Sequence, residues 1–205
     1  MTEAALLAAG VAEMGLEVSA EAQQQLLAYL ALLQKWNKVY NLTAITNPLE
    51  MVTLHLLDSL SVLPYMTDKN LLDIGSGAGL PGIVLAIVKP ELQVTCVDTV
   101  QKKTIFMRQV KAELGLQNLT VEHQRVENFK PAEKFEMVIS RAFSEIGIFK
   151  ALSMHLIAPT GVWLAMKGQN PVQELESLVE KPSKIIKLSV AGLNAERHLV
   201  IFENT

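Results

Sequence analysis

The sequence predicts an α/β fold: a mostly parallel, seven-stranded sheet with an antiparallel hairpin at its end, preceded by a helical N-terminal extension. From residue 71 onward, short apolar runs alternate with helix-compatible segments, which is typical of right-handed βαβ units. Before residue 67, apolar residues recur at helical spacing instead. The last two predicted strands are joined by a connection too short for a parallel crossover, so we expect them to pair antiparallel.

Length and composition restrict the class of protein. The chain has 205 residues, half of them hydrophobic, so it can bury a full core and is not a disordered protein. The single cysteine, Cys96, lies in an apolar run and is expected to be a buried core residue. The net charge of −3 provides no global attraction for nucleic acid, so an RNA partner must be held by a local patch. The first residues lack the basic start of a signal peptide, and no apolar run is long enough to span a membrane, so we expect a cytoplasmic protein.

Residues 1–66 are expected to form helices that pack on a single compact unit, residues 67–205, because no flexible linker separates the two. The first predicted helix covers 2–14, and Ser19 is a suitable N-cap for the second. Within 36–43, β-branched and turn-prone residues predict that this second helix breaks.

A further helix is predicted to begin at Asn47, an N-cap residue followed by Pro and then by Glu at the third helical position. This helix carries His55 and Asp58 one turn apart and ends near Pro64. The two residues are compatible with a catalytic pair, but we favour a polar pair that fastens the helical extension to the core.

The remaining elements alternate. Strands are predicted at 71–74, 93–98, 119–122, 135–140, 161–166, 184–190 and 197–203, and helices at 83–88, 102–114, 146–157 and 170–180. This is the architecture of class I (Rossmann-like) methyltransferases. A dehydrogenase usually needs a second domain, for which the chain has no room.

The most informative stretch is 71–82, where an apolar strand leads into a glycine turn (residues 75–82) and then into a helix. Gly75, Gly77 and Gly79 allow a tight turn whose backbone amides a ligand can approach closely. Asp73, just before the turn, would repel a pyrophosphate but suits a positively charged ligand. S-adenosylmethionine carries an ammonium and a sulfonium group, so we interpret the turn as its binding site, with Asp73 towards the amino-acid end.

Other nucleotide-binding motifs fit the turn less well. A P-loop ends in Gly-Lys-Ser/Thr, but this turn closes with Leu-Pro-Gly. The dinucleotide pattern Gly-x-Gly-x-x-Gly does occur at Gly77, Gly79 and Gly82, so a nicotinamide-dependent oxidoreductase or a non-catalytic nucleotide-binding module is an alternative. Counted from Gly75, where the strand ends, the sixth position is Leu80 instead of glycine.

Asp98 ends the second predicted strand, 23 residues after Gly75. Open α/β sheets place an acidic residue at about this distance, where it accepts hydrogen bonds from ribose hydroxyls. A carboxylate that merely caps the next helix would not explain this spacing. Lys102 and Lys103 follow in the first turn of that helix, where cations oppose the helix dipole. We hypothesise that both contact RNA phosphates, although two solvated lysines partly offset by Asp98 explain them equally well.

Three further segments follow strands at the edge where ligands of open α/β folds bind. The segment 125–128 (Arg-Val-Glu-Asn) is placed to contact the adenine edge through its backbone and its carboxylate. Arg141, in the segment 140–143, emerges towards the same crevice, and Lys167, followed by Gly168, occupies an analogous place. The four histidines are scattered, without a second ligand at metal-binding spacing, so we expect no metal site.

Four segments, taken together, are similar to one known family. They are Trp-Asn-Lys-Val-Tyr-Asn-Leu-Thr at 36–43, His-Leu-Leu-Asp-Ser-Leu at 55–60, Asp-Ile-Gly-Ser-Gly-Ala-Gly-Leu-Pro-Gly at 73–82 and Ser-Arg-Ala at 140–142. The chain resembles the RsmG (GidB) family of 16S ribosomal RNA N7-guanine methyltransferases. The resemblance covers nearly the whole chain and is far more specific than the glycine turn alone.

The resemblance implies methylation at N7 of a guanine in the 530 loop of 16S rRNA (guanine 527), with S-adenosylmethionine as donor and the small ribosomal subunit as partner. Donor contacts of that family match Gly75, Leu80, Val126, Glu127 and Arg141 here. Its plausible RNA contacts match Arg125, Arg141, Lys167 and Arg197. Arg141 is also the candidate catalytic residue, in a positioning role, and we expect a monomer.

The chemistry of guanine N7 requires no general base, because this atom has a free lone pair and no proton at neutral pH. We therefore predict catalysis by alignment and electrostatics. N7 faces the deep, narrow major groove of A-form RNA, so the target base should lie in a loop or be splayed out. From the residues alone, a small-molecule methyltransferase is the alternative, because it shares every feature of the donor site.

Overall fold

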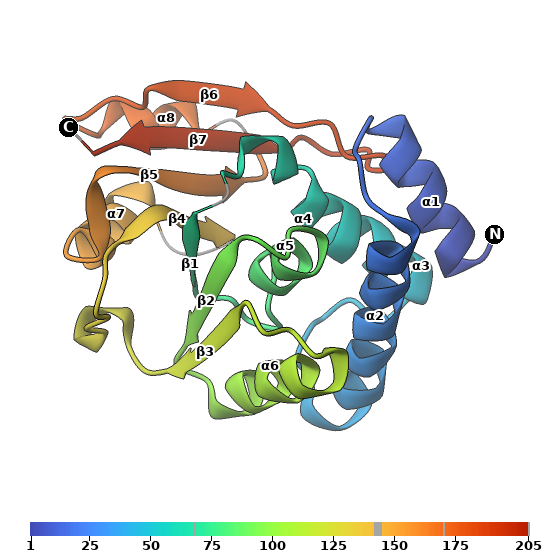
Figure 1. The fold of residues 1–205 in the computed structure, drawn as a ribbon. Helices are drawn as coiled ribbons and strands as arrows, with labels where there is room; N and C mark the ends of the chain where they lie inside the picture. The colour runs from blue at the N-terminus through green and yellow to red at the C-terminus, as the bar shows by residue number, and fades with distance from the viewer. Residues whose placement is uncertain (68, 142–144, 170, 205) are drawn as a thin grey trace.

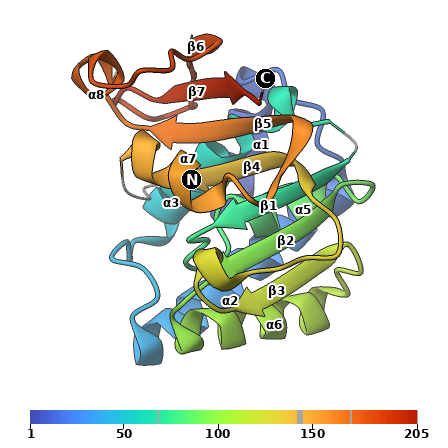
Figure 2. The same ribbon diagram turned by 90° about the vertical axis from the view of Figure 1, so that its left-hand side faces the viewer.

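A seven-stranded sheet forms the middle layer of the computed structural model, which describes residues 1–67, 69–141, 145–169 and 171–204 (Figure 1). The strands are β1 (Asn70–Ile74), β2 (Gln93–Asp98), β3 (Leu119–His123), β4 (Phe135–Arg141), β5 (Ile157–Lys167), β6 (Lys184–Lys187) and β7 (His198–Glu203). Figure 2 shows their order, β3-β2-β1-β4-β5-β7-β6. Among these strands β7 alone runs opposite to the other six, so it pairs antiparallel with β5 and with β6. The predicted fold class is confirmed, including the antiparallel pairing of the last two strands.

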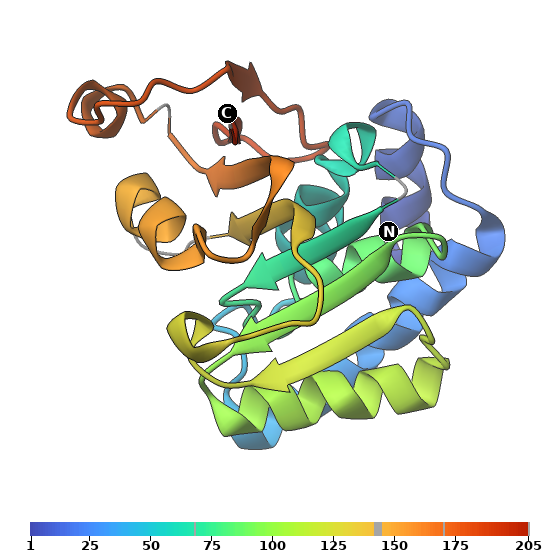
Figure 3. The ribbon, with the colours of Figure 1, turned by 60° about the vertical axis from the view of Figure 1, so that its left-hand side comes forward.

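Helices cover both faces of the sheet (Figure 3). One face carries α1 (Glu3–Glu13), α2 (Ala20–Tyr40), α3 (Pro48–Met51), α4 (Asp58–Leu60), α5 (Gly82–Val88) and α6 (Gln101–Leu114). The other face carries the 3₁₀ turn η3 (Val126–Asn128), α7 (Ile146–Ser153) and α8 (Val172–Glu176). A π-helical stretch, η1 (Val52–Leu57), joins α3 to α4, and a 3₁₀ turn, η2 (Leu63–Tyr65), precedes β1.

Each face of the sheet has its own hydrophobic core. On the side of the N-terminal helices, Tyr29 and Leu57 are fully buried together with Val84 and Phe106 from the alternating part of the chain. On the other side, the core is built around Trp163. Because the N-terminal helices supply buried side chains to the first core, they pack on it as expected. The division into an extension (1–66) and a core unit (67–205) stays a prediction.

The second helix extends further than its sequence indicates. α2 passes through Trp36 to Tyr40 and ends at Asn41, whose φ of 47° is left-handed. The Trp36 ring lies 5.1 Å from the Tyr40 ring and 5.6 Å from the Phe106 ring, measured between centroids. These contacts outweigh the weak helix propensity of the stretch, so the break predicted within 36–43 occurs only near its end.

The predicted helix at 146–157 is too long. α7 ends at Ser153, and Ile157 belongs to β5, because the chain has already joined the sheet: the Phe135 amide donates to the Leu156 carbonyl (2.8 Å). The helix predicted at 170–180 covers only Val172–Glu176, and Asn170 lies outside the described residues.

Candidate active site

The glycine turn links β1 to α5 at the carboxyl edge of the sheet, as predicted. Gly75, Gly77 and Gly79 have φ values of 67°, 62° and 94°, which residues with a Cβ rarely adopt. The amide of Gly75 donates to the Val97 carbonyl (2.9 Å), and that of Gly77 donates to Asp98 Oδ2 (2.8 Å). The end of β2 therefore anchors the turn.

A residue of the N-terminal helices holds the turn from the other side. The hydroxyl of Tyr29, on α2, donates to the carbonyl of Ala78 (2.9 Å), and Tyr29 is fully buried. Burial raises the pKa of Tyr29, so the hydroxyl keeps its proton and serves as a donor. Sequence reasoning missed this contact, because Tyr29 lies on the apolar face of an ordinary amphipathic helix.

Two cavities meet at the turn. The larger, of about 730 Å³, lies between the turn and the loop that follows α2. The smaller, of about 450 Å³, lies over the ends of β2 and β3. Of the residues predicted to bind the donor, the larger cavity is lined by Gly75, Gly77, Leu80 and Arg141, and the smaller by Gly75, Asp98, Val126 and Glu127. Gly75 and Lys103 belong to both walls, so the two cavities adjoin one another at these residues.

Asp73 is placed differently from the prediction, because its side chain lines neither cavity. It is fully buried, and Oδ2 accepts a hydrogen bond from the Gly82 amide at the start of α5 (2.8 Å). Oδ1 has no partner among the described residues, and burial raises the pKa of Asp73 to about 7. The carboxyl group supports the turn from the interior, beside the buried Cys96, so the structure shows a supporting role, and the direct contact with the donor stays a prediction.

Gly79 also lines neither cavity, and packing explains why this position lacks a side chain. A Cβ at Gly79 would lie 2.3 Å from Ile83 Cδ1, on α5. Gly79 therefore allows the turn to pack against the helix that follows it, in place of the ligand contact that the spacing predicted.

Asp98 has the capping role considered for it, and its contact with a ribose stays a prediction. It is 6% exposed, and its oxygens accept bonds from the amides of Gly77 (2.8 Å) and Val100 (2.8 Å), so it organises both the turn and the start of α6. It also lines the smaller cavity. Each carboxylate oxygen has a second lone pair, so Asp98 is able to accept further bonds from ribose hydroxyls.

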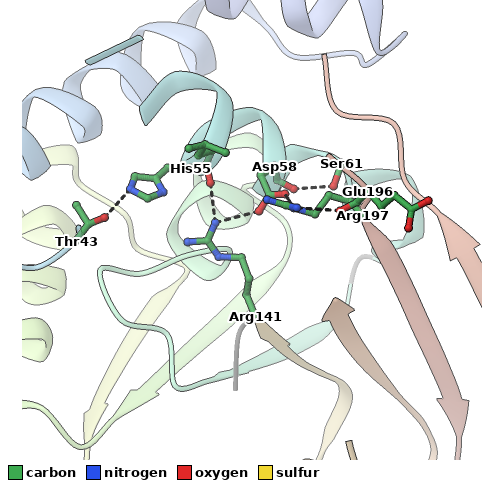
Figure 4. Close-up of polar contacts among 8 residues, drawn as sticks. Thr43, His55, Asp58, Ser61, Arg141, Glu196 and Arg197 are labelled. Carbon is green, nitrogen blue, oxygen red and sulfur yellow. Dashed lines mark hydrogen bonds and ion pairs between the residues drawn. The ribbon is translucent and has the colours of Figure 1, made fainter. Parts of the chain in front are cut away.

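Arg141 and Arg197 converge on one carboxylate (Figure 4). Arg141, the last residue of β4, donates through Nη1 to Asp58 Oδ2 (3.1 Å) and to the Leu54 carbonyl (2.9 Å). Arg197, just before β7, donates through Nε to Asp58 Oδ1 (2.6 Å). The Asp58 side chain is 4% exposed, against 21% and 24% for the two arginines. Two cations around one anion give this wall of the larger cavity a net positive charge.

This cluster decides between the two interpretations of His55 and Asp58. His55 Nε2 is bonded to Thr43 Oγ1 (2.9 Å) and not to Asp58, and its Nδ1 has no partner in the described part of the chain. Burial, and then the charge of Arg141, lower the pKa of His55 to about 4, so the ring is neutral at pH 7. Asp58 fastens the N-terminal helices to the core, as the favoured interpretation predicted, but His55 bonds within the N-terminal segment, so the two residues do not act as the expected pair.

The two lysines at the start of α6 have different surroundings. Lys102 Nζ donates to the Tyr40 carbonyl (2.6 Å) and so ties α6 to the end of α2. Lys103 lines both cavities at the point where they meet. The structure therefore separates a pair that sequence reasoning treated as one unit, and Lys103 is the better placed of the two for a ligand.

The other basic residues predicted to contact RNA also differ from one another. The Arg125 side chain is 72% exposed and pairs with Glu127 (3.2 Å) beside the smaller cavity. Lys167 pairs with Glu174, on α8 (3.0 Å), and lines the larger cavity. Of the segment 140–143, only residues 140 and 141 lie within the described residues.

Two other kinds of feature are absent from the described residues. Among the described residues, no three His, Cys, Asp or Glu side chains are grouped so as to hold a metal ion. No helix in the described ranges is both long and apolar enough to cross a membrane.

The relatives described next all carry the same name. Proteins called ribosomal RNA small subunit methyltransferase G are 61% identical over 194 residues in Methylobacillus flagellatus, covering 95% of each chain, and 51% identical over 207 residues in Aromatoleum aromaticum, covering 98% of each chain. The relative of that name in Pseudomonas aeruginosa is 50% identical, over 97% of this chain and 94% of its own.

Solved structures share the fold at low identity. An S-adenosylmethionine-dependent methyltransferase from Aquifex aeolicus has a TM-score of 0.54 at 20% identity, covering 74% of this chain and 92% of its own. TrmN from Thermus thermophilus has a TM-score of 0.56 at 14% identity, covering 83% and 52%. A family model described as GidB, rRNA small subunit methyltransferase G, matches residues 22–200. The chain belongs to the GidB family of rRNA small subunit methyltransferases G.

Proposed function

We propose that this protein transfers the methyl group of S-adenosylmethionine to N7 of a guanine in the 530 loop of 16S rRNA. Family membership and the shared methyltransferase fold support the reaction class and the rRNA substrate. The resemblance to the N7-guanine methyltransferases supports the choice of base and atom. We also propose that the enzyme is a monomer and acts in the cytoplasm on the small ribosomal subunit or its rRNA.

The two adjoining cavities are the observation that carries the proposal, because their linings together suit an elongated ligand. Asp98, in the smaller cavity, would hold the ribose hydroxyls of the donor, with Val126 and Glu127 beside the adenine. The glycine turn would hold the amino-acid portion in the larger cavity, where the positive φ values leave its backbone open to close approach. S-adenosylmethionine, once bound there, supplies an electrophilic methyl group.

The rest of the larger cavity is suited to the target base. Thr43 and His55 form the wall contributed by the N-terminal helices, and Arg141 forms part of the wall at the end of β4. Arg141 would position the guanine by stacking on it or by bonding its O6 edge. Methylation at N7 moves positive charge onto the base, and a neutral His55 avoids repulsion of that charge.

No proton leaves guanine N7 before attack, so the residues of the cavity need only bind and align the reactants. The rate with both substrates saturating should therefore not depend on deprotonation of any cavity side chain. The decisive comparison is between the wild type and a single variant that still binds both substrates normally. This mechanism would be contradicted if the wild-type rate rose with pH and the rate of that variant did not.

The direct test is tritiated methyl transfer to small ribosomal subunits from cells with and without this gene, followed by mapping of the modified base. Subunits from cells that lack the gene should accept methyl groups at one guanine N7 in the 530 loop, and subunits from cells that have it should already be modified. Modification of a different base or atom, or of metabolites without rRNA, would overturn the proposal.

A further inference from the structure

The end of α2, just before the loop that lines the larger cavity, presents an exposed aromatic residue. Tyr40 is 44% exposed and precedes by three residues Thr43, which lines that cavity. The Tyr40 ring packs against Trp36, and Trp36 packs against the fully buried Phe106. The ring is therefore supported by the core on one side and available to a ligand on its exposed side.

The two segments that meet at Tyr40 are basic although the whole chain is acidic. Residues 33–47 and 99–108 contain five Lys or Arg and no Asp or Glu, in a chain whose net charge is −3. α2 and α6 pack against each other (Figure 1), and the bond from Lys102 Nζ to the Tyr40 carbonyl joins the two segments at the backbone of this residue. Lys38 lies in the same last turn of α2, and Lys103 continues the basic surface into both cavities.

We propose that Tyr40 is a stacking platform for an unpaired RNA base next to the methylated nucleotide. This inference rests on the proposed rRNA methylation and adds a contact outside the reacting atoms. A guanine that exposes N7 to a protein cavity lies in a loop or is splayed out, so its neighbours are also free to stack on a side chain. Proteins that bind single-stranded RNA combine a basic surface with aromatic rings in this way.

The matched pair of variants is Tyr40→Leu and Tyr40→Phe, which both keep an apolar side chain on Trp36, although only phenylalanine can stack. Val39→Ala is the control, because Val39 is the neighbouring apolar residue and is 71% exposed. With saturating S-adenosylmethionine and small subunits from cells that lack the gene, Tyr40→Leu should raise the KM for subunits roughly 5- to 150-fold, the effect of losing one base–aromatic stack. Tyr40→Phe and Val39→Ala should change it less than about twofold.

Two further measurements show that the effect comes from stacking. The affinity for S-adenosylmethionine, measured by thermal shift, should be unchanged in all three variants. The slope of log affinity for subunits against log salt should also be unchanged in Tyr40→Leu, because a neutral ring releases no counterions. Equal KM values for Tyr40→Leu and Val39→Ala, or for Tyr40→Leu and Tyr40→Phe, would overturn the proposal, as would a loss of affinity for the donor.

Equilibrium binding of the same subunits, measured without methyl transfer, separates this inference from the proposed function. The ranking of the variants in that assay tests the platform even where the wild type modifies a different base. Absence of methylation at guanine N7, with the ranking preserved, would overturn the proposed function alone. A protein partner at this surface would instead make Val39→Ala as damaging as Tyr40→Leu, which would overturn the platform.

Discussion

Tyr29→Phe should weaken the binding of S-adenosylmethionine while preserving the fold. The change removes only the hydroxyl that donates to the Ala78 carbonyl across 2.9 Å and keeps the ring in its fully buried site. A buried carbonyl that loses its donor costs about 1–3 kcal/mol, and about 1.4 kcal/mol corresponds to a tenfold change in affinity. We expect the Kd to rise about five- to tenfold, towards the lower end of that range, because the bond from Gly77 to Asp98 still holds the turn.

The assay is a calorimetric titration with S-adenosylmethionine, combined with methylation kinetics at saturating RNA. The KM for the donor should rise in parallel with the Kd, and kcat at saturating donor should stay within about twofold of the wild type. Ser153→Ala is the matched control, because it also removes a buried hydroxyl, one that accepts a bond from Trp163 Nε1 (2.9 Å) on the opposite face of the sheet. If both variants lose stability and neither loses affinity for the donor, the role assigned to Tyr29 is refuted.

Three other predictions concern the same site. Asp58→Ala leaves two arginines without their shared carboxylate and should lower the free energy of unfolding by about 2–4 kcal/mol in urea titrations. A loss below about 1 kcal/mol, which is typical of a surface ion pair, would contradict the role of the buried cluster. Gly79→Ala should lower the melting temperature and the donor affinity more than Gly115→Ala. Both positions have positive φ, but only at Gly79 would a Cβ collide with a neighbouring side chain, that of Ile83. Equal losses of melting temperature in the two variants would therefore show that this collision does not matter. Asp73 has a folded pKa of about 7 against 3.8 when unperturbed, so the native state keeps a proton between these values and stability should fall as pH rises from about 4 to about 7. Asp73→Asn should remove this slope. If plots of the free energy of unfolding against pH stayed parallel for the variant and the wild type, Asp73 would not be its cause.

The elements and the glycine turn could be predicted because their signals are local. Alternating apolar runs, the Asn-Pro helix start and the spacing from Gly75 to Asp98 each lie within a short window of sequence. Parallel strands then bring their carboxyl ends to one edge of the sheet, so most residues chosen at strand ends do line the two cavities.

What could not be predicted depends on contacts between distant segments. Asp58 lies 83 residues from Arg141 and 139 from Arg197, and no local pattern connects them. The direction of the Asp73 side chain depends on which sheet face is filled by α5, which residue spacing alone does not give. The length of α2 depends on Phe106, which supports Trp36 and is likewise distant in sequence.

The position of β7 affects how the chain folds during synthesis. β6 leaves the ribosome before β7, yet β7 is its neighbour in the sheet, and β7 also covers the edge of β5. A nascent chain that ends between them therefore exposes unpaired strand edges, which are prone to aggregate. Lys184 and Lys187 at the two ends of β6 place charge on the more exposed of these edges. The wall of the larger cavity that contains Arg197 is completed only after this late insertion, so a partly made chain holds the glycine turn before it holds the whole cavity around it.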